Sequence, residues 1–147
     1  MKKKNFLQLE IPSKSENESL ARVVVAALAA QLDPTIDELN DVKTAVSEAV
    51  TNAVIHAYEE KEGIIVIKAE LYEDEIVVEI EDRGSGIKDL EKAREPLFTT
   101  KPEEERSGMG FTIMENFMDR VDIITEEKVG TRIIMRRKFN SVTPVGE

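Results

Sequence analysis

A row of polar residues spaced four apart is the first feature that could support chemistry. Glu48, Asn52 and His56 are separated by about one helical turn, so on a helix their side chains would be stacked neighbours. An apolar stripe at helical spacing runs beside them from Val42 to Ala57, and a cleft wall could form at its edge. A solvated polar ridge and a half-buried structural histidine explain the same spacing, so the row alone identifies no site.

The second feature is the stretch EDRGSGI, residues 81–87, which follows an apolar segment typical of a strand. A carboxylate buried at the strand end, as expected for Asp82, needs a hydrogen-bond donor, and the amino group of adenine is a suitable one. Gly84 and Gly86 have no β-carbon, so the backbone can turn sharply there and approach a flat base. A plain turn that ends the strand is the alternative, because D-x-G-x-G alone is weak evidence.

The third feature is the stretch SGMGF, residues 107–111, in which Gly108 and Gly110 open a predicted helix. Free amide groups and the helix dipole at such a start favour an anion such as a phosphate. A flexible hinge capped by Ser107 explains the same residues. The chain has no G-x-x-x-x-G-K-[ST] pattern, so this stretch is not a Walker P-loop.

Length, charge and composition restrict the class of protein. The 147 residues suit one compact domain, expected over 1–140, with a flexible tail at 141–147. The absence of cysteine excludes disulfides and thiol nucleophiles and suits a cytoplasmic location. A net charge of −10 argues against direct nucleic-acid binding and favours a basic protein partner. No apolar run is long enough to span a bilayer, so no membrane association is expected.

Periodicity and turn signals predict an α/β fold of two layers. Strands are expected at residues 4–11, 64–72, 75–82, 121–127 and 130–139, and helices at 15–32, 35–58 and 107–120. The S/T-x-x-E patterns that begin at Ser15 and Thr35 predict a capping box at the start of each of the first two helices. Because the strands form hairpins rather than βαβ units, we expect a mostly antiparallel sheet with helices on one face.

The first predicted helix is apolar on nearly all sides. One face carries Leu20, Val23, Val24, Ala27 and Leu28, and the other carries Arg22, Val25, Ala26 and Ala29. The second face is unusually apolar for a solvated surface, and such a helix is either fully internal or bound to a partner. We expect the helix to contribute to a protein interface in which Arg22 is an anchor.

Taken together, EAVTNAVIHAY, EDRGSGI, SGMGF and the late GT resemble the successive sequence boxes of the GHKL ATPases. The chain, including residues 15–58, resembles the anti-sigma-factor serine kinases of that superfamily, and most closely the sporulation members. The resemblance implies a Bergerat-type sandwich that binds ATP or ADP with Mg²⁺. It implies a homodimer that inhibits a sporulation sigma factor of the sigma-F kind and phosphorylates a serine of an anti-anti-sigma protein.

The same resemblance implies roles for residues of the polar row and the glycine motifs. Asn52 would bind Mg²⁺ through its amide oxygen, and Glu48 would orient or accept the proton of the attacking serine. Asp82 would accept a hydrogen bond from the adenine amino group, and the glycines at 84 and 86 would shape the base pocket. Thr131 would complete the adenine end of the site.

The resemblance also assigns the phosphate end of the site. Gly108 and Gly110 would offer backbone groups to the phosphates, with Ser107 at the start of the motif and Met109 and Phe111 packed behind. Residues 89–107 would form a lid over the nucleotide. Its candidate phosphate contacts are Thr99, Thr100, Lys101 and Arg106, although charged loop residues are also commonly just solvated.

Three alternative functions remain open from the sequence. A stress-response anti-sigma kinase of the same family would carry very similar boxes. A module that binds nucleotide only to set its shape would carry them as well. A histidine-kinase-type ATPase domain is the third, although the single histidine, His56, lies inside the predicted helix rather than on a separate phosphoacceptor helix.

Overall fold

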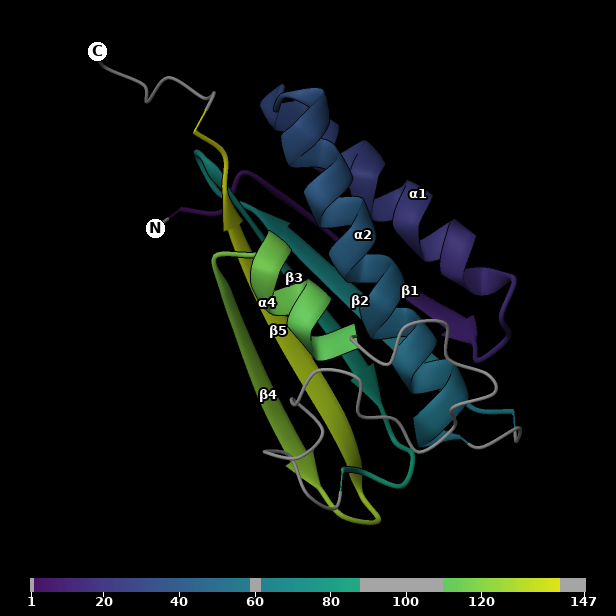
Figure 1. The fold of residues 1–147 in the computed structure, drawn as a ribbon. Helices are drawn as coiled ribbons and strands as arrows, with labels where there is room; N and C mark the ends of the chain where they lie inside the picture. Colours follow the sequence, from purple (N-terminus) through teal and green to yellow (C-terminus); the bar gives the residue numbers. More distant parts are fainter. Residues whose placement is uncertain (1, 59–61, 88–109, 141–147) are drawn as a thin grey trace.

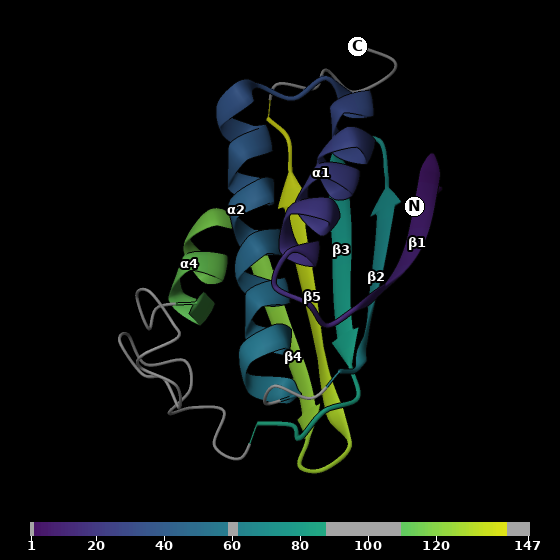
Figure 2. The same cartoon turned by 90° about the vertical axis from the view of Figure 1, so that its right-hand side faces the viewer.

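The computed structural model describes residues 2–58, 62–87 and 110–140, and it has two layers. An antiparallel sheet forms one layer, and the helices cover one of its faces (Figures 1 and 2). In chain order the elements are β1 (Asn5–Pro12), α1 (Asn17–Ala29), α2 (Ile36–Asn52), β2 (Ile64–Leu71), β3 (Glu75–Asp82), α4 (Gly110–Phe117), β4 (Arg120–Glu126) and β5 (Gly130–Lys138). The predicted two-layer α/β class is confirmed.

The sheet has the strand order β1-β2-β3-β5-β4, and its four pairings are antiparallel. Both predicted hairpins, β2–β3 and β4–β5, are present. Alternate residues of β2, from Ile65 to Leu71, are buried under the helices, and Ile76, Val78 and Ile80 of β3 continue this face. The pairing of β3 with β5 places Asp82 directly opposite Thr131 at the end of the sheet.

Helix α2 begins at the capping box that the sequence predicts. The Thr35 hydroxyl accepts from the Glu38 N–H at 3.1 Å, and the Glu38 carboxylate accepts from the Thr35 N–H at 3.0 Å. The second Glu38 oxygen accepts from the Asn140 N–H at 2.7 Å, which ties the helix start to the end of β5. The apolar stripe of α2 packs in the core, where Val42, Val46 and Val50 are fully buried.

Helix α1 differs from its prediction in two ways. The capping box at Ser15 and Glu18 does not form: the helix begins at Asn17, and its N-cap, Glu16, makes no side-chain capping bond. The buried side also draws on both predicted faces, because Val25 and Ala29 of the second face and Leu28 of the first pack against the core together with Ala21. Leu20 and Val23 of the first face are 46% and 59% exposed.

The open face of the sheet is covered by paired charges. Glu79 of β3 lies between Lys68 of β2 and Arg132 of β5 and forms ion pairs with both. A depression of about 400 Å³ on this face is lined by these residues together with Phe6 and Ile134. It lies on the opposite side of the sheet from the helices, so it is not part of the site described below.

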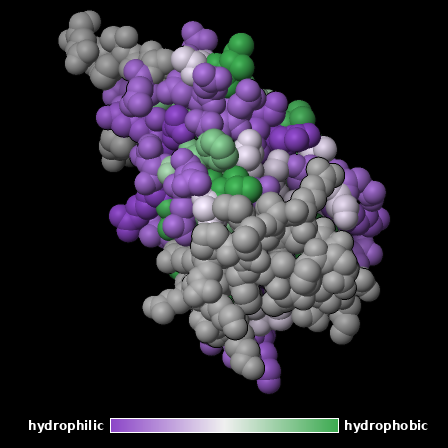
Figure 3. Space-filling view, in the orientation of Figure 1, coloured by the Kyte–Doolittle hydropathy of each residue, from purple (hydrophilic) through white to green (hydrophobic). Residues whose placement is uncertain are grey.

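The described residues that are visible in Figure 3 form a largely hydrophilic surface with small hydrophobic patches. Within the described residues, no helix is both long and apolar enough to cross a membrane.

Candidate functional site

The loop that carries EDRGSGI is held between the end of the helical layer and the β4–β5 hairpin. On the helix side, the Ser85 N–H donates to the Ala57 carbonyl at 2.9 Å. On the hairpin side, the Lys128 N–H donates to the Ser85 carbonyl at 2.6 Å, and the Ile87 N–H donates to the Thr125 hydroxyl at 2.8 Å. These bonds bring the glycine loop, residues 81–87, together with the end of the helical segment that carries Glu48, Asn52 and His56.

Asp82 ends β3 with its side chain on the helix-facing side of the sheet, where the residue is only 6% exposed. One carboxylate oxygen accepts from the Gly84 N–H at 3.0 Å. Burial raises the pKa of this carboxyl above its usual 3.8, and hydrogen bonds from the backbone of Gly84 and Thr131 partly oppose that rise. The carboxylate is thus poorly solvated, which increases its tendency to accept a further donor from a ligand.

The backbone path of the loop at residues 81–87 requires glycine at both positions 84 and 86. A β-carbon on Gly84 would lie 2.2 Å from the Ala57 carbonyl oxygen, so a side chain there would push the loop off the helix. Gly86 has φ +74°, a left-handed conformation, and a β-carbon added at this position would lie 2.3 Å from the Glu126 carbonyl oxygen. EDRGSGI is therefore more than a strand-ending turn, because it is fitted against two other elements.

The polar row lies on the helical segment that leads to this loop. Glu48 and Asn52 are both half-buried, and Asn52 is the last residue of α2. A π-helical turn, Ala53–Ala57, follows and contains His56. Because a π turn is wider than an α turn, His56 departs from the strict row that the spacing predicts.

Only the end of the SGMGF motif lies within the described residues. Gly110 opens α4, and Phe111 is buried beneath it. Helix α4 packs against α2, which places its start beside the helix that carries Asn52 (Figure 2). Its last turn is held by Arg137, whose guanidinium donates to the Phe117 carbonyl at 2.6 Å and pairs with Asp41 of α2 at 2.9 Å.

The rest of the predicted phosphate end lies outside the described residues. This applies to the lid at 89–107, and the tail at 141–147, a separate prediction, is outside them as well. It applies equally to Thr99, Thr100, Lys101, Arg106, Ser107, Gly108 and Met109.

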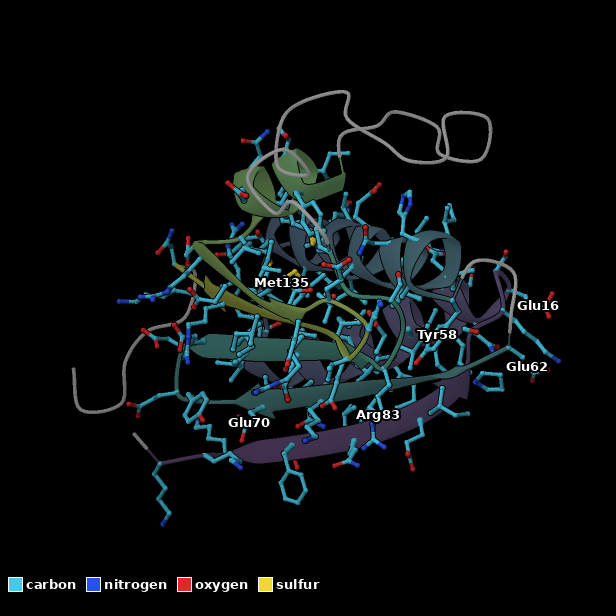
Figure 4. All side chains as sticks on the ribbon, turned by 90° about the horizontal axis from the view of Figure 1, so that it is seen from below. Glu16, Tyr58, Glu62, Glu70, Arg83 and Met135 are labelled. Carbon is cyan, nitrogen blue, oxygen red and sulfur yellow. The ribbon has the colours of Figure 1, made fainter. Side chains whose placement is uncertain are left out.

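Sequence reasoning missed two residues that the structure places at the loop. The Tyr58 hydroxyl accepts from the Arg83 N–H at 2.8 Å, and Tyr58 and Arg83 lie at the same end of the molecule (Figure 4). The Thr125 hydroxyl lies 2.9 Å from that of Thr131, which is buried beside Asp82. Tyr58 stands 25 residues before Arg83 and Thr125 stands 38 residues after Ile87, so neither contact has a signal in the local sequence.

Arg22 belongs to α1 and to a different part of the surface. Its guanidinium donates to the Ser19 hydroxyl at 3.3 Å and lies 3.8 Å from the Glu18 carboxylate. The Nε atom is buried and has no hydrogen-bond partner among the described residues. The side chain is nonetheless 38% exposed, so its outer end can reach a partner.

Residues 11–137 match the family model of the histidine kinase-like ATPase domain, which defines the class of the fold and of its nucleotide site. Among relatives, an anti-sigma F factor of Clostridium perfringens strain SM101 is 59% identical over 138 residues, which cover 93% of this chain and 99% of that protein. An anti-sigma F factor of Clostridium beijerinckii is 56% identical over 140 residues, 95% of this chain and 98% of that protein. The chain therefore belongs to the anti-sigma F factor family of histidine kinase-like ATPase domains.

A solved structure supports the fold independently. The crystal structure of the RsbU and RsbW domains of Rv1364c from Mycobacterium tuberculosis superposes with a TM-score of 0.66 at 18% identity. The match covers 92% of this chain but 32% of that one, so this chain spans about a third of its length. At this identity the likeness shows the fold alone.

Proposed function

We propose that this protein is an anti-sigma factor that inhibits a sporulation sigma factor of the sigma-F kind and is itself an ATP-dependent protein-serine kinase. Its kinase substrate is an anti-anti-sigma protein, which phosphorylation inactivates. The observation that carries the proposal is 56–59% identity, over nearly the whole chain, to proteins named anti-sigma F factor. The buried Asp82, the fitted glycine loop and the adjoining polar row supply a site suited to the nucleotide.

Asp82 accepts the hydrogen bond of the adenine amino group in this proposal. A carboxylate at this position selects adenine over guanine, because guanine presents a carbonyl oxygen in place of the amino group. Gly84 and Gly86 leave room for the base, and Thr131 lies beside the carboxylate to complete the adenine end. The support for these roles is the burial of Asp82 and its position opposite Thr131 in the sheet.

In this proposal, residues of the polar row carry out phosphoryl transfer. The serine oxygen attacks the γ-phosphorus, the bond from that phosphorus to the bridging oxygen breaks, and ADP leaves. Glu48 orients the serine hydroxyl and takes its proton. Ionised glutamate is a weak base, so alignment contributes more than basicity in a loose transition state.

Mg²⁺ neutralises the phosphate charge when bound, and the amide oxygen of Asn52 is a hard donor suited to it. Within the described residues, no three histidine or carboxylate side chains are grouped to hold an ion. In this proposal the cation would be held by Asn52, the phosphates and water. Residues 89–107 would close over the nucleotide as a lid, with the phosphate contacts predicted above.

In this proposal the chain forms a homodimer, and α1 contributes to the surface that binds its protein partners. Leu20 and Val23 present an exposed apolar surface, and Arg22 lies beside it with a buried Nε atom that has no hydrogen-bond partner in the described part of the chain. Arg22→Glu should weaken binding of the sigma factor or of the anti-anti-sigma protein and leave ATP affinity unchanged, because α1 does not carry the nucleotide site. Unchanged affinity for both partners in a pull-down titration would exclude this role for Arg22.

The test of the enzymatic proposal is a reaction with γ-labelled ATP, Mg²⁺ and a candidate anti-anti-sigma protein from the same organism. Acid-stable phosphoserine on that protein is the expected product. Binding of ATP without transfer would instead indicate a module that uses nucleotide to set its shape, and acid-labile phosphate on a histidine partner would indicate a histidine-kinase-type domain. Copurification of partners from the native cell identifies the sigma factor and separates a sporulation role from a stress-response role.

A further inference from the structure

The Tyr58 hydroxyl joins three segments at the end of the molecule that carries the glycine loop. It donates to the Ile64 carbonyl at the start of β2 at 2.7 Å and accepts from the Arg83 N–H just after β3 at 2.8 Å. Tyr58 itself directly follows the π turn that ends the polar-row helix. One side chain thus bridges the helix end, the first residue of β2 and the glycine loop.

The two hydrogen bonds are chemically complementary. A phenolic hydroxyl has one proton, so donation to Ile64 leaves its lone pairs to accept the proton of the Arg83 amide. The ring also needs the glycine at 63, because a β-carbon there would lie 2.3 Å from a ring carbon. The packing of the ring therefore places the hydroxyl between the two backbone groups.

The position of this bridge relates it to base recognition. Arg83 lies between Asp82, the proposed adenine contact, and Gly84, whose N–H donates to the Asp82 carboxylate. The bond to Tyr58 therefore holds the amide in the middle of the segment that orients that carboxylate. The bond from Ser85 to Ala57 holds the next residues of the loop against the same helix end.

We propose that Tyr58 is a positioning residue for the nucleotide base, acting through its hydroxyl on the Asp82–Gly84 segment. The proposal rests on the proposed nucleotide site and extends it to a residue that touches no nucleotide. Loss of the hydroxyl leaves the Arg83 N–H without its partner and lets the segment that carries Asp82 shift. The effect falls on base binding rather than on the transfer step, because Glu48 lies on α2, ahead of the π turn.

The test is Tyr58→Phe, which removes one oxygen atom and keeps the ring that packs against residue 63. The dissociation constants of ATP and ADP should rise together by about 2- to 10-fold, the usual effect of losing one hydrogen bond at a partly exposed position. KM for ATP should rise in parallel, while kcat at saturating ATP stays within about twofold. Tyr72→Phe is the matched control: it alters the other tyrosine of the chain, next to the β2–β3 turn, and should change none of these values.

The outcomes separate this proposal from the proposed function. If the wild-type protein binds ATP and transfers phosphate but Tyr58→Phe has unchanged nucleotide affinity, the positioning role is wrong and the proposed function stands. A lower kcat at unchanged KM would also overturn the positioning role. If the wild-type protein itself does not bind ATP, the proposed function is wrong, and the positioning role that rests on it is wrong as well.

A measurement on the wild-type protein covers the case in which Tyr58→Phe does not fold. Amide hydrogen exchange at Arg83, followed by NMR, should be slow in the nucleotide-free protein, because the hydroxyl protects this N–H. Exchange at the rate of an open loop would show that the bridge is absent in solution and would overturn the proposal.

Discussion

Gly84→Ala gives a sharp prediction because the contact that it creates is with backbone. The new β-carbon would lie 2.2 Å from the Ala57 carbonyl oxygen and 2.5 Å from its carbon, whereas ordinary contact begins near 3.4 Å. The loop and the helix end must therefore separate by about 1 Å, which lengthens the hydrogen bond from Ser85 to Ala57. Overpacking of this kind costs about 1–3 kcal/mol of folding free energy. The expected fall in Tm is about 3–10 °C for a chain of this size.

Thermal unfolding and ATP titration of the Gly84→Ala variant measure the two consequences. ATP affinity should fall by at least about tenfold, equivalent to about 1.4 kcal/mol, because the displaced Gly84 N–H no longer orients the Asp82 carboxylate. A second substitution, Ala57→Gly, removes the β-carbon at 2.6 Å but leaves the carbonyl oxygen in place, so it should not restore either property. Wild-type Tm and ATP affinity in the single variant would refute the proposed fit of loop against helix.

The remaining predictions concern the capping box, the α4 anchor and the buried carboxyl. Thr35→Ala should lower the free energy of unfolding by about 1 kcal/mol in urea denaturation and leave ATP affinity unchanged, because it removes one helix cap remote from the loop. Arg137→Met should lower stability by about 2 kcal/mol, since it removes hydrogen bonds from a charged donor to Phe117 and Asp41. Because burial raises the pKa of Asp82, stability from this group is present below pH 3.8 and is lost as the pH rises through the raised pKa. The unfolding free energy of wild type relative to Asp82→Asn should therefore fall across that pH range in urea titrations, and a pH-independent difference would contradict the burial argument.

Much of the fold could be predicted because hydrophobic periodicity and hairpin signals act locally. The capping box at Thr35 was found by this reasoning, yet the same pattern at Ser15 failed. There the backbone forms a turn in which the Glu18 N–H donates to the Ser15 carbonyl at 3.2 Å, and the helix begins only at Asn17. A local pattern cannot show which of two competing backbone arrangements the rest of the chain favours.

The buried side of α1, which mixes the two predicted faces, has a related cause. Its residues are apolar on almost every side, so no stripe distinguishes the buried face from the exposed one. The side that contacts α2 and the sheet includes the small residues Ala21 and Ala29, while Val23 is exposed.

For the candidate site, the burial of Asp82 and the sharp turn at Gly84 and Gly86 could be predicted because neighbouring residues carry both signals. Tyr58 and Thr125 could not, because each acts on a backbone group far along the chain. The Tyr58 bond to Arg83 spans 25 residues, and the bond from Ile87 to Thr125 spans 38. Side chains that bond to the backbone leave no complementary residue in the sequence from which the contact can be inferred.

The central claim, that the polar row and the glycine loop form one serine-kinase site, is tested most directly by the Glu48→Gln variant. The measurement is the rate of phosphoserine formation on the anti-anti-sigma protein at saturating ATP, with ATP affinity determined on the same preparation. We predict near-wild-type ATP affinity and transfer slowed by about 10²–10⁴-fold, as expected when a proton acceptor is lost. Transfer at the wild-type rate would contradict the account.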